Sequence, residues 1–134
     1  MPLNGCESAS PEFPVRRFAP MARLLDDSEL FGVDASAIVL ARLRAQRRKI
    51  FHMYAMEFRR QSIHVTRLRL AAIGRDGEWD ELPATCARAM KLFGIWLKFQ
   101  RAWVLHGWHV REAPARIVTD SLRSCDALLA SDVA

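Results

Sequence analysis

Residues 35–73, ASAIVLARLRAQRRKIFHMYAMEFRRQSIHVTRLRLAAI, contain neither proline nor glycine, and this uninterrupted stretch predicts a long helix. Apolar residues recur along it at steps of three and four, with two gaps, which places them on one side of a helix. They are Leu40, Leu43, Ile50, Tyr54, Phe58, Val65, Leu68 and Ala72. A helix of this length spans about 57 Å at about 1.5 Å per residue. Because such a rod is too long for a compact domain of 134 residues, we expect it to pair with another long helix or to self-associate.

The segment after this stretch predicts a reversal and a second helix. Residues 74–83 hold two glycines, four acidic residues and Pro83, which suits the first turn of a helix because a first-turn amide has no helical partner. We expect a second helix over about 82–111, ending before Pro114, and a shorter third helix over about 115–130. The predicted fold class is all-α, with helices 35–73 and 82–111 forming an antiparallel hairpin.

The N-terminal segment has a different composition from the rest of the chain. Residues 1–33 carry four of the six prolines, and each proline removes an amide donor and restricts the residue before it. We expect a mostly disordered, Pro-rich flexible tail over 1–33, with a short helical turn near 21–30 as the alternative, and a single helical domain over 34–134. No stretch predicts a secretory signal or a membrane-spanning helix, so we expect a cytoplasmic protein.

Positive charge is concentrated in the first long helix. Residues 42–69 hold nine basic residues and one acid, Glu57, and so contribute +8 to a net charge of +5. At 100° per residue, one arc roughly opposite the apolar stripe carries the predicted anionic-surface contacts. These are Arg42, Arg48, Lys49, Arg59, Arg60 and Arg67. The arc indicates a surface for phosphates of nucleic acid or lipid, or else a solvated helix face.

The predicted second helix is apolar over more than half of its circumference. Its side chains form either a packed core or a surface for self-association or contact with an apolar phase, since one partner helix covers roughly one stripe. The candidates for that contact are Phe93, Trp96, Leu97, Trp103, Val104 and Trp108.

Residues typical of catalytic or metal sites are present but do not form a recognised pattern. His106, His109 and Glu112 recur at steps of three, yet a metal site requires a further ligand, and we interpret the histidines as solvent-facing or helix-terminal. Cys86 and Cys125 are interpreted as small core residues. We therefore predict no catalytic residues, no metal, no cofactor and no enzymatic activity.

The layout of two long helices around a short acidic linker, with ELPATCARAMKLFGIWLKFQRAW at residues 81–103, resembles the phasin family over roughly residues 34–112. Phasins coat polyhydroxyalkanoate storage granules. The resemblance implies a homo-oligomer whose amphipathic helices pack on a hydrophobic polymer surface and on one another, and it implies no catalytic residues.

The sequence thus predicts a non-enzymatic helical protein that self-associates and binds an apolar or anionic surface, such as a polymer granule or an anionic lipid surface. A basic helical module that binds nucleic acid is the first alternative. A structural subunit of a helical complex is the second.

Overall fold

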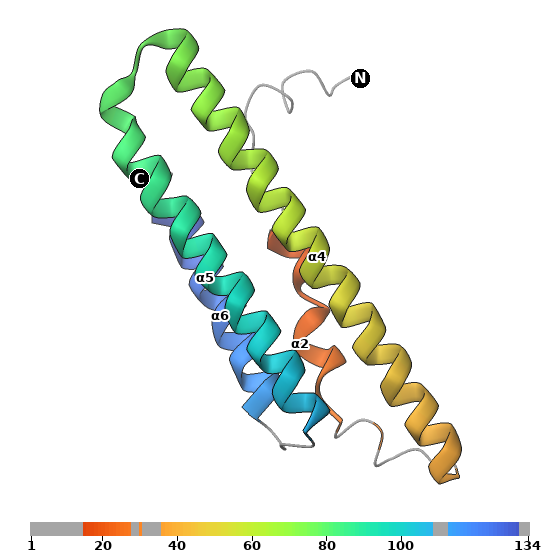
Figure 1. Ribbon diagram of the computed structural model, residues 1–134. Coiled ribbons are helices and arrows are strands. Elements are labelled where there is room, and N and C mark those ends of the chain that lie inside the picture. Colours follow the sequence, from red (N-terminus) through yellow and green to blue (C-terminus); the bar gives the residue numbers. More distant parts are fainter. Residues whose placement is uncertain (1–14, 28–29, 31–35, 109–112, 132–134) are drawn as a thin grey trace, which may run out of the picture.

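The computed structural model describes residues 15–27, 30, 36–108 and 113–131, and within these ranges the chain is helical and contains no strand (Figure 1). The predicted all-α class is therefore confirmed for this part of the chain. The elements are η1 (Val15–Phe18), α2 (Met21–Leu24), α4 (Ala37–Asp76), η2 (Trp79–Glu81), α5 (Leu82–Gly107) and α6 (Ala113–Ser131). None of these helices has the length and hydropathy needed to cross a membrane.

Helix α4 has 40 residues, which gives a rod of about 60 Å. Ser36 caps its N-terminus by accepting a hydrogen bond from the amide of Val39 at 3.3 Å. The helix continues through Gly74 and ends at Asp76. The next residue, Gly77, caps it: its φ of 73° is left-handed, and its amide donates to the carbonyl of Ile73. Of the two glycines in the predicted break, Gly77 is therefore the terminator, because glycine adopts this conformation without steric cost.

The chain then reverses through η2 into α5, which has Pro83 in its first turn as predicted. Figure 1 shows α4 and α5 lying side by side and joined at one end, a hairpin-like arrangement. Helix α5 ends at Gly107, before the predicted limit of 111. Helix α6 includes Pro114 in its first turn, packs along α5 and contacts α2 as well.

Aromatic side chains from three elements form the centre of the core. Phe58 of α4 and Phe99 of α5 are fully buried and meet edge to face, with ring centroids 4.9 Å apart. Phe51 contacts Phe99 in the same way, at 6.3 Å. Because the buried row of α4 includes Phe51 and Ile73, the helix faces the core on a line slightly rotated from the predicted stripe, and the predicted members Ile50 and Leu68 are exposed.

The described part of the N-terminal segment packs on the helices, which corrects the prediction of a mostly disordered tail for residues 15–27. Phe18, Met21 and Leu25 are buried, and the ring of Phe18 lies 5.3 Å from that of Phe58. The alternative of a short helical turn is the better description of this part, although α2 begins at Met21 and ends at Leu24. The prolines signalled an interruption of long helices but not the burial of the apolar residues between them. Residues 1–14 lie outside the described part of the chain.

Candidate interaction surface

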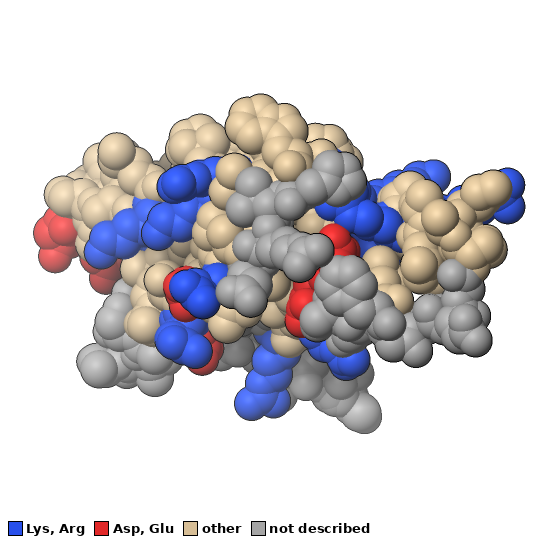
Figure 2. Space-filling model, turned by 90° about the horizontal axis from the view of Figure 1, so that it is seen from below, with Lys and Arg blue, Asp and Glu red and all other residues tan. Residues whose placement is uncertain are grey.

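The side of α4 that faces away from the core carries alternating cationic and apolar side chains. Arg42, Lys49 and Arg67 are exposed, and no ion pair joins them to any acid in the described part of the chain. Met53 and Ile63 are also exposed and share this side of the helix. Figure 2 shows one face of the whole molecule, on which Lys and Arg side chains lie in separate groups among uncharged ones. Cationic and apolar side chains are thus interspersed on the outer face of α4, and this face is not continuously basic.

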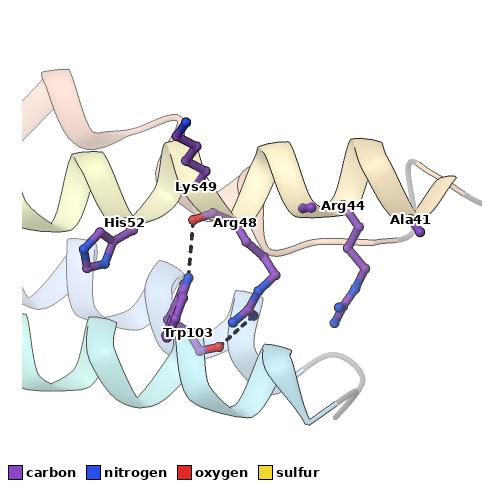
Figure 3. Close-up of a pocket in the computed structure, with 7 residues that line it drawn as sticks. Ala41, Arg44, Arg48, Lys49, His52 and Trp103 are labelled. Atoms are coloured by element: carbon purple, nitrogen blue, oxygen red, sulfur yellow. Dashed lines mark hydrogen bonds between the residues drawn. The ribbon is translucent and has the colours of Figure 1, made fainter. Parts of the chain in front are cut away.

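Arg48, one of the predicted anionic-surface contacts, faces α5 instead of the outer side of α4. Its guanidinium points toward α5, donates to the carbonyl of Trp103 at 2.8 Å and stacks over the indole of Trp103 at 4.3 Å (Figure 3). The indole N–H of Trp103 in turn donates to the carbonyl of Arg48 at 3.3 Å. Lys49, one residue later, points away from α5 in Figure 3 and stays on the outer face. The angular positions of Arg48 and Lys49 around the axis of α4 did not predict that Arg48 faces α5 and Lys49 faces outward.

The two arginines at the middle of α4 are exposed but have partners. Arg60 forms a bidentate pair with Glu57, at 2.6 and 2.9 Å. Hydrogen bonds from Arg60 and Gln61 lower the pKa of Glu57 to about 2, so this carboxylate is charged at neutral pH. The guanidinium of Arg59 lies 5.6 Å from the ring of Trp96 and so connects α4 to α5. Arg60 therefore presents less net charge to an anion than its exposure suggests.

A buried polar cluster fixes the C-terminal end of α5. His106 is buried, and its Nδ1 lies 2.8 Å from the guanidinium of Arg48, while its Nε2 lies 2.9 Å from the carboxylate of Asp27. Since a guanidinium can only donate, Nδ1 accepts and Nε2–H donates to Asp27. Arg44 completes the cluster by donating to Asp27 at 3.0 Å and to the carbonyl of His106.

The charges in this cluster are set by burial and by their neighbours. Burial lowers the pKa of His106, and the nearby cations Arg44 and Arg48 act in the same direction against the opposing effect of Asp27. Burial alone would raise the pKa of Asp27, but the hydrogen bonds from His106 and Arg44 outweigh it and lower the pKa. The interpretation of His106 as solvent-facing is wrong, although it does lie in the last turn of α5. His109 and Glu112 lie outside the described residues.

The side of α5 that faces away from α6 is an exposed apolar row. Met90 is 75% exposed, Phe93 55%, Leu97 48%, Val104 40% and Trp108 73%. These values place four of the six predicted apolar contacts at the surface and show that α5 is not covered all round by α4 and α6.

The other two predicted apolar contacts, Trp96 and Trp103, are partly buried at the edge of this row. Phe93 stacks on Trp96 with ring centroids 5.8 Å apart. Buried N–H groups of Trp96 and Gln100 meet no acceptor among the described residues. These donors can be satisfied by oxygen atoms of a bound partner or by water.

A groove of about 360 Å³ lies where the exposed sides of α4 and α5 meet. Arg59, Ile63 and Arg67 line it from α4, and Phe93 and Trp96 line it from α5. The cationic face of α4 and the apolar row of α5 are therefore continuous across it.

A second hollow, of about 560 Å³, is lined by Arg44, Arg48, Lys49, His52 and Trp103 (Figure 3). Its two arginines already bind groups within the fold, so Lys49 is the cation that remains for a ligand there.

The described part of the chain has few features of a catalytic or metal site. It contains no cluster of three or more His, Cys, Asp or Glu that could hold a metal ion. Cys125 is buried as predicted, and burial raises the pKa of its thiol to about 12, which keeps it protonated. Cys86 is exposed, which contradicts its interpretation as a core residue. Compared with protein-family models, curated proteins and solved structures, the chain gives no match.

Proposed function

We propose that this protein is a non-enzymatic helical interaction protein of the cytoplasm that binds an apolar phase bearing anionic groups, and that it does so through the outer sides of an antiparallel α4–α5 pair. The observation that carries the proposal is the continuity of the apolar row of α5 with the outer face of α4. Exposed Phe93 and Leu97 supply apolar area, and exposed Arg42, Lys49 and Arg67 supply charge.

This combination matches the chemistry of an interface between water and an apolar phase. A helix at such an interface buries apolar side chains and keeps basic ones at the level of anionic headgroups, where each contributes about 1 kcal/mol. A purely solvated face of α4 would not explain exposed Met53 and Ile63 between its cations. An anionic lipid surface and a coated polyhydroxyalkanoate granule both offer this chemistry, and the granule is the target that the resemblance to phasins implies.

The same row of α5 supports self-association. Cys86, Met90, Phe93, Leu97, Gln100 and Val104 recur at steps that alternate between four and three residues, which is the spacing of a coiled-coil seam. All except Gln100, which is partly buried, are exposed within the single chain. We propose that a second copy covers this row in solution and that the apolar phase replaces it at an interface, so that the protein is a homo-oligomer when unbound.

Vesicle flotation at low salt tests the proposal. We expect the wild type to float with anionic phospholipid vesicles and to sediment with polyhydroxybutyrate particles. Arg42→Glu should weaken vesicle binding, whereas the matched control Arg123→Glu, at an exposed site on α6, should not. Failure to bind either particle at low salt would refute the proposed function.

A nucleic-acid-binding module remains the second candidate, because Arg42, Lys49 and Arg67 are exposed on one side of α4. It predicts duplex DNA binding whose affinity falls by about 0.9 log units per log unit of salt for each phosphate contacted. Unchanged DNA binding in Arg42→Glu would exclude this face as the site.

A structural-subunit role predicts instead that the exposed row of α5 is covered only in a complex with a different chain. A stable monomer in solution would argue against this role.

A further inference from the structure

The groove between α4 and α5 is lined by both cationic and apolar side chains. Arg59 and Arg67 both line it, and they are eight residues apart, or about 12 Å along the helix axis. Between them α4 contributes Ser62, Ile63 and Thr66 to the lining, and α5 contributes the apolar side chains Leu92 and Phe93. A hydrocarbon chain with an anionic end has the same arrangement of an apolar length and a terminal charge.

The arginines at the two ends of the groove differ in the contacts that they already make within the fold. At one end the guanidinium of Arg59 is already stacked over the ring of Trp96. Because the chain reverses after Gly77, the other end lies where Arg67 of α4 meets Ala89 of α5. Arg67 is exposed and forms no ion pair with any described acid, and Thr66 adds a hydroxyl donor beside it. The anion therefore fits best at Arg67.

The size of the groove selects among amphiphiles. A volume of about 360 Å³ is near the lower end of the roughly 300–1,000 Å³ typical of small-molecule sites. This favours one hydrocarbon chain over the two chains of a phospholipid. Helix α5 contains no acidic residue, so no carboxylate on that wall repels an anion.

We propose that this groove binds a free amphiphile with one hydrocarbon chain and a terminal carboxylate, held by Arg67 at the carboxylate and by Ile63, Leu92 and Phe93 along the chain. The inference rests on the proposed function in that the groove opens on the same surface. The proposed ligand is soluble, so its binding to the groove and the binding of the protein to an interface can be measured separately.

Isothermal titration calorimetry of the full chain with decanoate, below its critical micelle concentration, tests the proposal. We expect saturable binding of one decanoate per chain, with weaker binding of both decanol, which lacks the charge, and acetate, which lacks the chain. Arg67→Gln should weaken decanoate binding about tenfold by removing a charge-assisted hydrogen bond. Arg42→Gln, the same change on the same helix outside the groove, should leave it unchanged. Phe93→Ala should weaken it too, with circular dichroism checking that each variant is folded.

The results separate this proposal from the proposed function. Absence of saturable decanoate binding, equal binding of decanol, or equal loss in Arg67→Gln and Arg42→Gln would overturn the groove proposal. If vesicles bind and decanoate does not, the groove is not a ligand site and the surface function stands. If decanoate binds at Arg67 but neither vesicles nor polyhydroxybutyrate particles bind, the groove is supported and the proposed function is refuted.

Discussion

Replacement of His106 by phenylalanine should destabilise the protein and remove part of its dependence on pH. The change keeps a ring of similar size in a buried position but removes both ring nitrogens. It therefore breaks the hydrogen bonds from Nε2 to Asp27 and from Arg48 to Nδ1 while preserving most of the packing. These bonds join the N-terminal segment, α4 and α5, so their loss weakens the packing of all three segments on one another.

The magnitude follows from what remains bonded after the substitution. Hydrogen bonds to charged groups contribute about 1.5–3 kcal/mol each. Asp27 keeps its bond from Arg44, and Arg48 keeps the carbonyl of Trp103, so neither charge is left without a partner. The lower end of the range therefore applies to each bond, and we expect the free energy of unfolding to fall by about 3 kcal/mol at pH 7.5.

The sign of the pH dependence follows from the lowered pKa of His106. The folded state holds the neutral imidazole, and a proton added at Nδ1 would face the guanidinium of Arg48. The unfolded chain thus binds more protons below about pH 6.5, the ordinary pKa of histidine. Stability is full above that pH and falls as the pH decreases, by at most about 1.4 kcal/mol per pH unit for this one group. The lowered pKa of Asp27 acts in the same direction at lower pH.

Urea unfolding followed by circular dichroism at pH 7.5 and pH 5.5 measures both effects. The wild type should lose stability at the lower pH, and His106→Phe should lose less because it lacks the titrating ring. His64→Phe, an exposed site on α4, is the matched control and should keep the wild-type pH dependence. A His106→Phe variant within about 0.5 kcal/mol of the wild type, a typical limit for surface changes, would refute the assigned cluster.

Three further substitutions test the core, the turn and the outer row of α5. Phe99→Ala should lower the free energy of unfolding by about 3–5 kcal/mol in urea titrations, because it leaves a cavity against Phe51 and Phe58; a loss under about 1 kcal/mol would contradict the packing. Gly77→Ala should cost about 1–3 kcal/mol through its left-handed backbone alone, since an added Cβ meets no atom within 4 Å; an unchanged thermal midpoint would count against that turn. Leu97→Glu should shift the protein to monomer in analytical ultracentrifugation at unchanged helicity, and an unchanged mass would mean that this row is not the seam.

The sequence was most informative about backbone elements. The absence of glycine and proline over 35–73 predicted the long helix, because those residues are the ones that interrupt helices most strongly. The position of Pro83 predicted the start of the next helix. The end of α4 was less predictable, because Gly74 and Gly77 look alike in sequence and only the backbone conformation of Gly77 distinguishes them.

The candidate surface was predicted less completely, for a physical reason. An arginine is long enough to reach either the solvent or a carbonyl on a neighbouring helix, so its angular position does not decide its partner. Arg48 turns to α5 while Lys49 stays outside, and nothing in their spacing indicates this difference. The burial of His106 depends on Asp27, 79 residues away, a contact that no local pattern encodes.

Quenching of tryptophan fluorescence by brominated lipid acyl chains tests the proposed contact of α5 with an apolar phase, because it reports whether exposed side chains of α5 enter that phase. With anionic vesicles that carry the brominated lipid, we predict strong quenching in the wild type. Trp108→Phe should remove a share of the quenched emission while the protein still binds. Vesicle binding without any quenching would show that charge alone holds the protein at the headgroups, and it would contradict the account of α5 as a surface for an apolar phase.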